Sequence, residues 1–248
     1  NAKRTGVELD WAEQVEGEYE DLWPDDPMSS SYERDHGITF PIQVYALFEQ
    51  ARRHELGLNS EAYRQGIGRL FAPFSDVAAN NPYAQFPTAR SVDDFATFSA
   101  QNFPLCEPYA KWMVAQDAVN QAAAVVMTSV GLARKLGIPP AQWIYLNAYA
   151  DVDELPVVER PRLASSAAQG LALARVLEDA GVGIDAVEFI DFYSCFPIAV
   201  SGACEHLGLP VDGSRALTLT GGLPCFGGPG NNYSLHAIAE VVQQLRGL

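Results

Sequence analysis

The chain has 248 residues, 48% hydrophobic content and a net charge of −15, which is enough material for one sizeable core or two small ones. The negative charge opposes binding to nucleic-acid phosphates and to anionic membranes, because such binding needs clustered Lys and Arg. No apolar run reaches the roughly 18 residues of a membrane span, and Asn1-Ala-Lys-Arg4 is not an apolar leader. The expectation is a cytoplasmic protein without a membrane segment.

The N-terminal third of the chain predicts an acidic arm followed by helices. Residues 1–35 hold eleven acidic and three basic residues without an apolar period, which is typical of a solvated arm or linker. Apolar residues at helical spacing then predict helices over 41–56 and 60–79, with an interruption at Pro73 and a short helix near 92–99.

An alanine-rich run in the middle of the chain predicts a long helix over 117–136. It would end at Gly137, with Arg134 and Lys135 placed favourably against the helix dipole. Its nearly all-apolar surface predicts full burial. Because Val125 and Val126 are β-branched, the same run also permits a strand.

From there on the pattern alternates between strand and helix. The predicted strands are 143–149, 187–193 and 216–220, and the predicted helices are 165–181, 197–208 and 231–246. Such alternation indicates an α/β layered sheet flanked by helices. Ligands collect at the carboxyl ends of strands in these sheets, where Tyr193 and the glycine-rich loop after residue 220 would both lie.

The glycine-rich loop leads directly into the last predicted helix. Its glycines permit sharp turns or close approach to a ligand, and Asn231 or Asn232 could cap the helix. Free N–H groups there would form an anion or oxyanion site, although a plain tight turn explains the glycines equally well. The loop has neither the Lys-Ser/Thr ending of a P-loop nor Rossmann spacing.

The four cysteines show no zinc-site spacing and no Cys-x-x-Cys pattern, so reduced thiols and no metal are expected. Cys204 lies in a helical pattern and is expected in the core, whereas Cys106 is expected in a loop. For Cys195 and Cys225, loop packing and a place in a site both stay open.

Two segments and their order resemble the thiolase superfamily. Thiolases carry an Asn-Glu-Ala-Phe loop, or His-Asp-Cys-Phe in the sterol-carrier-protein type, followed by Gly-Gly and then by Gly-His-Pro at the start of a helix. Here Tyr193-Ser-Cys-Phe196 stands at the first position, and Gly221-Gly222 with Gly227-Gly228-Pro229 stand at the second. The run over 117–129 is also similar to a thiolase core segment.

The resemblance covers roughly residues 38–247 and implies a thiolase-like α/β fold, a mixed sheet flanked by helices. Residues 36–108 would be a helical loop domain over the CoA and acyl site, and residues 109–248 the second half-fold. The first half-fold, which holds the family's nucleophile, and the last two strands of the second are not found. We therefore expect that the natural protein is longer or that another chain supplies these parts.

Departures from the family pattern define the candidate site. Gly228 stands where thiolases have their catalytic histidine, and Tyr193 replaces the Asn or His of the first loop. A phenol can still donate a hydrogen bond to an oxyanion. The resemblance implies these catalytic candidates: Tyr193, Cys195, Tyr233 and His236. The candidates for oxyanion or substrate binding are Gly227, Gly228, Asn231 and Asn232.

Each of these candidates also has a structural explanation. Tyr193 and Tyr233 can be packing aromatics, and a lone His236 on a helix is more often a hydrogen-bonded surface residue than a base. If the site exists, Tyr193 and the loop over 227–232 should meet at one concave place, with Cα atoms within about 10 Å.

The resemblance implies a protein that acts on an acyl-CoA thioester, by acyl transfer as in acetyl-CoA acetyltransferases or by carbon–carbon bond formation or cleavage, including a retro-aldol reaction. The alternative is a degenerate CoA-binding, acyl-binding or scaffolding subunit. No covalently bound cofactor is expected. Thiolase-like proteins form homodimers or hetero-oligomers, some with an OB-fold, zinc-ribbon partner. The cations that could contact CoA are Arg64, Arg69, Lys111, Arg134 and Lys135.

Overall fold

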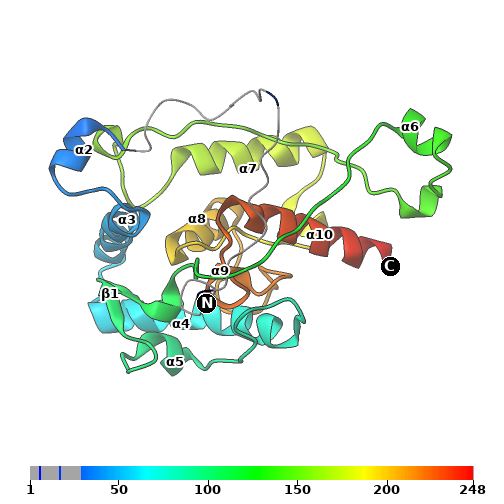
Figure 1. The fold of residues 1–248 in the computed structure, drawn as a ribbon. Coiled ribbons are helices and arrows are strands. Elements are labelled where there is room, and N and C mark those ends of the chain that lie inside the picture. Colours follow the sequence, from blue (N-terminus) through cyan, green and yellow to red (C-terminus); the bar gives the residue numbers. More distant parts are fainter. Residues whose placement is uncertain (1–5, 7–16, 18–28, 248) are drawn as a thin grey trace.

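The computed structural model describes residues 6, 17 and 29–247, and Figure 1 shows their arrangement. Most of the predicted acidic arm therefore lies outside the described residues. Its last part is helical, not extended: α2 spans Ser31–Asp35. The Ser30 side chain accepts from the Glu33 N–H while the Glu33 carboxylate accepts from Ser30 N–H, and this capping box starts the helix despite the local charge.

The next helices confirm the apolar periodicity of the sequence. They are α3 (Pro41–Glu55), α4 (Ser60–Asn80) and α5 (Val92–Ala96). Asn59 caps α4 by accepting from the Ala62 N–H at 2.8 Å. The predicted interruption of α4 at Pro73 is wrong. The helix continues because its residues on both sides of Pro73, including Phe71, Phe74 and Ala78, are buried in the core.

Helix α4 is the centre of the hydrophobic core. The rings of Phe71 and Phe74 lie 5.3 Å apart, and Phe71 also packs on Phe95 of α5 at 6.2 Å. The same cluster includes Val200 and Cys204, which are essentially inaccessible to solvent, so the expected core position of Cys204 is confirmed. Residues from both sides of the predicted boundary at 108 thus share one core, and the boundary itself stays a prediction.

Three longer helices complete the second half of the chain. They are α7 (Ala167–Ala180), α8 (Pro197–Leu207) and α10 (Tyr233–Arg246), as the sequence predicts. Gly181 and Gly208 end the first two in the left-handed conformation. The shorter elements are α9 (Gly222–Cys225) and the 3₁₀ turns η1 (Lys111–Met113), η2 (Pro140–Gln142), η3 (Val157–Glu159), η4 (Ile184–Ala186) and η5 (Gly230–Asn232).

The predicted strands do not form a sheet within the described residues. The sheet there consists of β1 (Pro104–Cys106) and β2 (Tyr109–Ala110), so Cys106 lies at a strand end and not in a loop. Segments 187–193 and 216–220 do lie side by side, because Phe192 N–H donates to Leu217 C=O at 3.1 Å. The expected strand over 143–149 is likewise unassigned.

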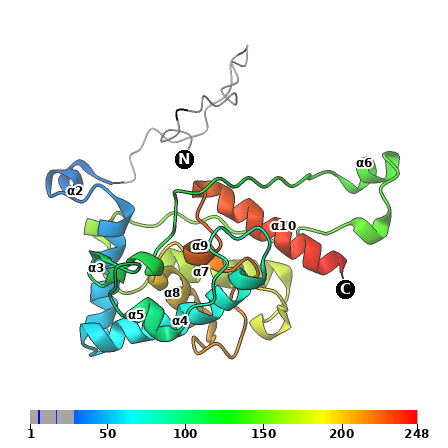
Figure 2. The same ribbon diagram turned by 60° about the horizontal axis from the view of Figure 1, so that its bottom comes forward.

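The predicted long helix over 117–136 is wrong. Residues 115–129 are mostly extended, and only α6 (Val130–Lys135) is helical, at the tip of an arm that projects from the body (Figure 2). Predicted burial also fails, since Val126 is 95% exposed. The physical reason lies in the backbone: peptide groups of Ala115, Gln116 and Ala123 bond to other segments and are not available for bonds within a helix.

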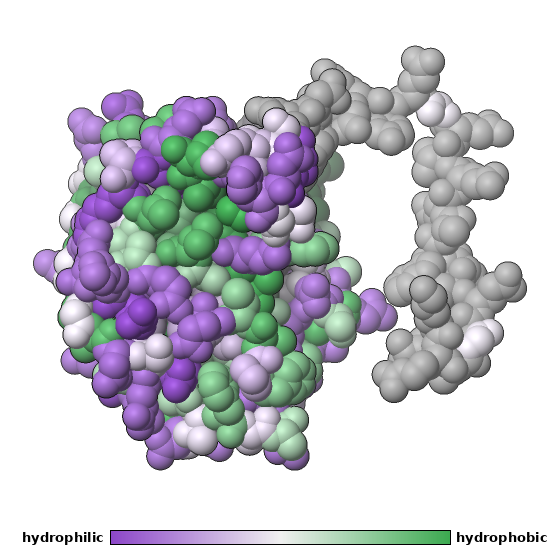
Figure 3. Space-filling view, turned by 90° about the vertical axis from the view of Figure 1, so that its left-hand side faces the viewer, coloured by the Kyte–Doolittle hydropathy of each residue, from purple (hydrophilic) through white to green (hydrophobic). Residues whose placement is uncertain are grey.

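Hydrophobic residues also gather on the face formed by α2, α3 and their neighbours. Figure 3 shows them as a patch bordered by hydrophilic residues. Exposed apolar side chains of this part of the chain include Tyr32, Phe40 and Leu47. No helix of the described residues is long and apolar enough to cross a membrane.

Candidate functional site

The two segments singled out in the sequence touch each other in the structure. The Tyr193 hydroxyl lies 3.5 Å from the Gly230 carbonyl oxygen, at the outer limit of a hydrogen bond. The rings of Tyr193 and Tyr233 meet edge to face at 5.6 Å. Tyr193 is 41% exposed, so part of its side chain faces solvent. The strand-end motif and the glycine loop therefore share one location, at the start of α10.

Tyr233 is the buried partner of this pair. Its hydroxyl donates to Asp191 Oδ1 at 2.8 Å and lies 2.6 Å from Thr220 Oγ1. Burial, followed by the nearby Asp191 charge, raises the pKa of Tyr233 well above its ordinary value. The phenol therefore keeps its proton, and its position inside the protein suits it to hold the loop in place.

Asp191 joins the two segments, and sequence reasoning missed it. Its Oδ2 accepts from the backbone N–H groups of Leu219 and Thr220 at 2.8 and 2.9 Å, and from the Thr218 and Thr220 hydroxyls. In a sheet, the Leu219 and Thr220 N–H groups would donate to carbonyl groups of a neighbouring strand. Here they donate to the Asp191 carboxylate, which explains why segment 216–220 is not a regular strand. The available signal was an acidic residue inside the apolar run Val187-Glu-Phe-Ile-Asp191.

The first glycines of the loop are explained by packing. Gly221 and Gly222 have φ of 109° and 74°. A Cβ atom on Gly221 would lie 2.5 Å from the Ala78 side chain, and one on Gly222 would lie 2.5 Å from the Phe74 ring. Ser194 Oγ closes the same turn by accepting from the Leu223 N–H at 3.0 Å. This part of the loop is a tight turn against α4.

The later glycines lie beneath a crossing segment that we call the strap, residues 115–123. Gly228 N–H donates to the Gln116 carbonyl at 2.8 Å, and Ala115 N–H donates to the Cys195 carbonyl at 2.9 Å. Gln121 Nε2 donates to the Phe226 carbonyl at 3.1 Å. The strap therefore binds both motif segments, and the Gly228 N–H is not free for an oxyanion in this structure.

The two asparagines at the start of α10 do not cap it. Asn232 Oδ1 accepts from Ala123 N–H at 3.0 Å, and its Nδ2 donates back to the Ala123 carbonyl. Asn232 instead fastens the end of the strap, and Asn231 is exposed. The expected cap is wrong because the 3₁₀ turn η5 leads directly into α10. Nothing in the sequence indicated that Gln116, Gln121 and Asn232 act together, since the strap was predicted to be helical.

Cys195 lies on the other side of the motif, near α3. Burial raises the pKa of its thiol to about 11, against an opposing effect of the Tyr45 side chain, so the thiolate is scarce at neutral pH. Cys225 is fully buried in the glycine loop, and burial raises its pKa to about 12. Neither thiol has the lowered pKa of an activated nucleophile.

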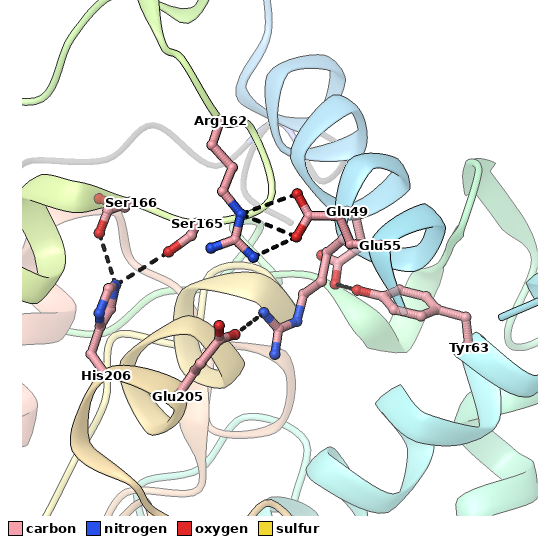
Figure 4. A network of polar contacts seen from close by, with 9 residues as sticks. Glu49, Glu55, Tyr63, Arg162, Ser165, Ser166, Glu205 and His206 are labelled. Atoms are coloured by element: carbon pink, nitrogen blue, oxygen red, sulfur yellow. Dashed lines mark hydrogen bonds and ion pairs between the residues drawn. The ribbon is translucent and has the colours of Figure 1, made fainter. Parts of the chain in front are cut away.

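A buried carboxyl group supports the helix that follows Cys195. Glu49 Oε2 accepts from the Tyr109 hydroxyl at 2.8 Å and from Ile198 N–H at 3.2 Å, in the first turn of α8. Glu49 Oε1 accepts from the Tyr63 hydroxyl at 2.6 Å (Figure 4). Desolvation raises the pKa of Glu49 to about 7, against the lowering effect of these hydrogen bonds.

Three of the five cations considered for CoA lie over different aromatic rings. Arg64 lies over the Phe98 ring and pairs with Glu107. Arg134, in α6, lies over the Trp143 ring. Lys111 shares the Trp112 ring with Arg90, whose guanidinium is 3.8 Å from the ring centre. Among the described residues, no group of three or more His, Cys, Asp or Glu side chains could hold a metal ion.

Comparison with known proteins identifies the fold. No family model matches the chain. An acetyl-CoA acetyltransferase of Methanothermobacter thermautotrophicus is 25% identical over 236 residues, 87% of this chain and 57% of that protein. The crystal structure of a monomeric SCP2-thiolase like protein type 1 from Mycobacterium smegmatis has a TM-score of 0.84 and 48% identity, and covers 90% of this chain. The chain belongs to the thiolase superfamily.

The thiolase-like α/β fold predicted from the sequence is thereby confirmed. A solved Ltp2-ChsH2(DUF35) aldolase matches with a TM-score of 0.62 and 17% identity, over 88% of this chain, which is a likeness of fold alone. The chain spans about half the length of these relatives: 57% of the acetyltransferase, 49% of the thiolase-like protein and 58% of the aldolase chain.

In this thiolase-superfamily chain, His236 is the imidazole beside the glycine loop. Its ring lies 5.2 Å from the Phe226 ring, and its buried Nε2 has no hydrogen-bond partner among the described residues. Burial lowers the pKa of His236, so the ring is neutral near pH 7. Because thiolases carry their histidine at the position of Gly228, His236 would have to serve from a different element, α10.

Proposed function

We propose that this chain is part of a thiolase-like protein that acts on an acyl-CoA thioester, by acyl transfer or by forming or breaking a carbon–carbon bond. The observation that carries the proposal is the contact between Tyr193, a half-exposed residue, and the glycine loop. The relative named as an acetyl-CoA acetyltransferase supports acyl transfer, and the fold shared with an aldolase is compatible with carbon–carbon bond chemistry.

Tyr193 would stabilise negative charge on the thioester oxygen. Burial and the neighbouring Cys195 raise the pKa of Tyr193, so the hydroxyl stays protonated and can donate to an oxyanion. Tyr233 and Asp191 would hold the loop in position, and neutral His236 would accept or return a proton at Nε2. Cys195, Gly227 and Asn231 remain candidates for contact with the substrate. With a pKa of about 11, Cys195 would act as a protonated thiol.

The test is Tyr193→Phe in the full-length protein, assayed for thiolysis of acetoacetyl-CoA and for cleavage of 3-hydroxyacyl-CoA. We expect turnover to fall by about ten- to a thousandfold, the cost of removing one preorganised donor. KM should change little, because the hydroxyl acts mainly in the transition state. Tyr83→Phe removes an exposed hydroxyl elsewhere and serves as the control. Unchanged turnover in a folded Tyr193→Phe protein contradicts the proposal.

A second candidate is a catalytically degenerate subunit that binds CoA or an acyl group, or that scaffolds a partner. Two observations favour it: the Gly228 N–H already donates to the strap, and the raised pKa values of Cys195 and Cys225 keep both thiols protonated. It predicts that acetyl-CoA binds to the full-length protein by calorimetry with equal affinity before and after Tyr193→Phe, without turnover of either assay substrate.

We also propose that the protein assembles with a second chain. The aldolase relative is a complex with a DUF35 protein, whereas the mycobacterial relative is monomeric. A homodimer and a hetero-oligomer with an OB-fold, zinc-ribbon protein are both compatible with these relatives. Light scattering of the full-length protein, alone and copurified from its native source, tests this: a single-chain mass in both samples contradicts assembly.

A further inference from the structure

A cavity of about 210 Å³ lies between α3, α7, α8 and the segment over 154–166. This is roughly the space of seven water molecules at about 30 Å³ each. Its walls combine apolar and polar groups, and none of the candidate site residues described above lines it. The residues that line it include Tyr45, Phe48, Glu154, Arg160, Gln169 and Ala199.

One wall carries charges of opposite sign that are both held in place. The Arg160 guanidinium lies 4.5 Å over the Phe48 ring, and its Nε donates to the Leu155 carbonyl at 2.9 Å. Glu154 lies 3.9 Å from Arg160 Nη1 and accepts from the Ser166 hydroxyl. Because the two charges cancel, a ligand with its own net charge would gain little there, whereas an uncharged polar ligand would find donors and acceptors.

The cavity wall offers both hydrogen-bond donors and hydrogen-bond acceptors to a ligand. Arg160 has five N–H groups, of which one is bonded to a carbonyl and one approaches Glu154. Gln169 Nε2 donates to the Ala199 carbonyl at 2.9 Å, which fixes the carboxamide and leaves Oε1 as a free acceptor. Oε1 lies against bare backbone of α8, since a Cβ atom on Gly202 would be 3.0 Å from it.

Tyr45 connects the cavity to the Tyr193–Phe196 motif. Tyr45 lines the cavity and stacks on the Phe196 ring at 4.3 Å. The cavity therefore begins beside the Tyr193–Phe196 motif and ends in polar side chains. On its outer side, Ser165 and Ser166 are held by His206, as Figure 4 shows.

We propose that this cavity binds a short, uncharged acyl group that carries a hydroxyl or an amide. The size of the cavity limits the group to about as many non-hydrogen atoms as the seven waters it could hold. Its balanced charges and free donors and acceptors select against carboxylates and against purely apolar groups. The inference deepens the proposed function and rests on it for one point, that the ligand is the acyl part of a thioester.

Binding of free fragments to the full-length protein tests the cavity without requiring turnover. The probes are 3-hydroxybutyramide, the anionic 3-hydroxybutyrate and toluene, which have equal numbers of non-hydrogen atoms. We expect 3-hydroxybutyramide to bind saturably in NMR titrations, at least about tenfold more tightly than either other probe. Failure of the amide to bind, or equal or tighter binding of the acid or toluene, overturns the proposal.

Variants locate the binding. Ala199→Leu fills the cavity from α8 and should weaken amide binding at least about tenfold, whereas Ala174→Leu, an exposed position on α7 outside the cavity, should not. If Ala199→Leu fails to fold, Gln169→Leu provides the test by removing the free acceptor. Unchanged amide binding in a folded cavity variant overturns the proposal. Because no turnover is measured, this outcome is independent of the Tyr193→Phe assay.

Discussion

Single polar side chains in this protein are fixed by partners far away in the sequence. Asp191 gathers donors from the Thr218–Thr220 segment and Tyr233, and Glu49 gathers Tyr63, Tyr109 and the first turn of α8. Both carboxyl groups act as acceptors for donors that would otherwise be buried without partners. Such residues support the site without contacting a substrate, and their effects can be measured as stability.

Asp191→Asn should destabilise the protein by about 3 kcal/mol or more. Asparagine places an NH₂ group against the Leu219 and Thr220 N–H donors, or against the Tyr233 hydroxyl, so buried donors lose their acceptor whichever way the amide turns. Urea denaturation measures the change. The control, Asp153→Asn, makes the same charge change at an exposed position. A loss similar to the control would show that Asp191 does not hold the loop.

Glu49 should make the protein less stable as the pH rises. Its pKa is about 7 in the folded protein against an ordinary value of 4.5, so between these values the unfolded chain releases a proton that the folded protein retains. The contribution to the free energy of unfolding should fall by on the order of 3 kcal/mol from pH 4.5 to 8. Denaturation of wild type and Glu49→Gln across this range measures the difference.

Glu55→Gln is the control for the Glu49 experiment. Glu55 is paired with Arg162 at the surface, which lowers its pKa, so its effect should not change between pH 5.5 and 8. A difference between wild type and Glu49→Gln that is constant over pH 4.5 to 8 would be incompatible with a buried carboxyl of raised pKa.

At the scale of elements, the strap and the turn before α9 connect the two motif segments to the helices. The strap is extended because its backbone bonds to the motif and the glycine loop, and the turn at Gly221–Gly222 fits directly against α4. Neither feature depends on local helix or strand preference. Their tight fit predicts that glycines in the same loop will differ greatly in their tolerance of a side chain.

Gly222→Ala should cost about 2 to 5 kcal/mol, from left-handed strain together with overpacking. Its Cβ would lie 2.5 Å from the Phe74 ring and 2.6 Å from Ser194 Oγ. Gly230→Ala is the matched control, because it also has positive φ but meets nothing within 4 Å. It should cost only about 1 to 2 kcal/mol. Equal unfolding free energies for the two variants would refute close packing at Gly222.

At the scale of the whole molecule, the projecting arm that carries α6 is the most exposed apolar feature of the described residues. Val126, Met127, Leu146 and Tyr149 are 95%, 76%, 69% and 76% exposed. Exposed apolar surface of this kind favours association. The arm and the hydrophobic face in Figure 3 belong to different parts of the chain.

The pair of changes Val126→Lys and Leu146→Lys should reduce self-association of the 248-residue chain with little effect on its unfolding midpoint. Lysine on an exposed arm removes apolar contact surface without disturbing the core. Analytical ultracentrifugation and thermal denaturation give the two measurements. Val211→Lys, a change at a 43% exposed valine in a loop of the body, controls for added charge. A large fall in the midpoint would mean that the arm is covered.

Features with local causes could be predicted from the amino-acid sequence. The helices α3, α4, α7, α8 and α10 follow from the spacing of apolar residues. The order of the Tyr193 motif and the glycine loop was enough to indicate the thiolase superfamily, because spacing along the chain survives substitution of single residues such as Gly228.

Three features become visible only in the folded chain: the course of the strap, the replacement of a strand ladder by Asp191, and the bond of Asn232 to Ala123 in place of a cap on α10. These bonds join residues distant in sequence, so no local pattern contains them. The same holds for Glu49, whose raised pKa comes from burial beneath helices α4 and α8. Composition along the chain records which groups can form hydrogen bonds, but the packing of the chain selects their partners.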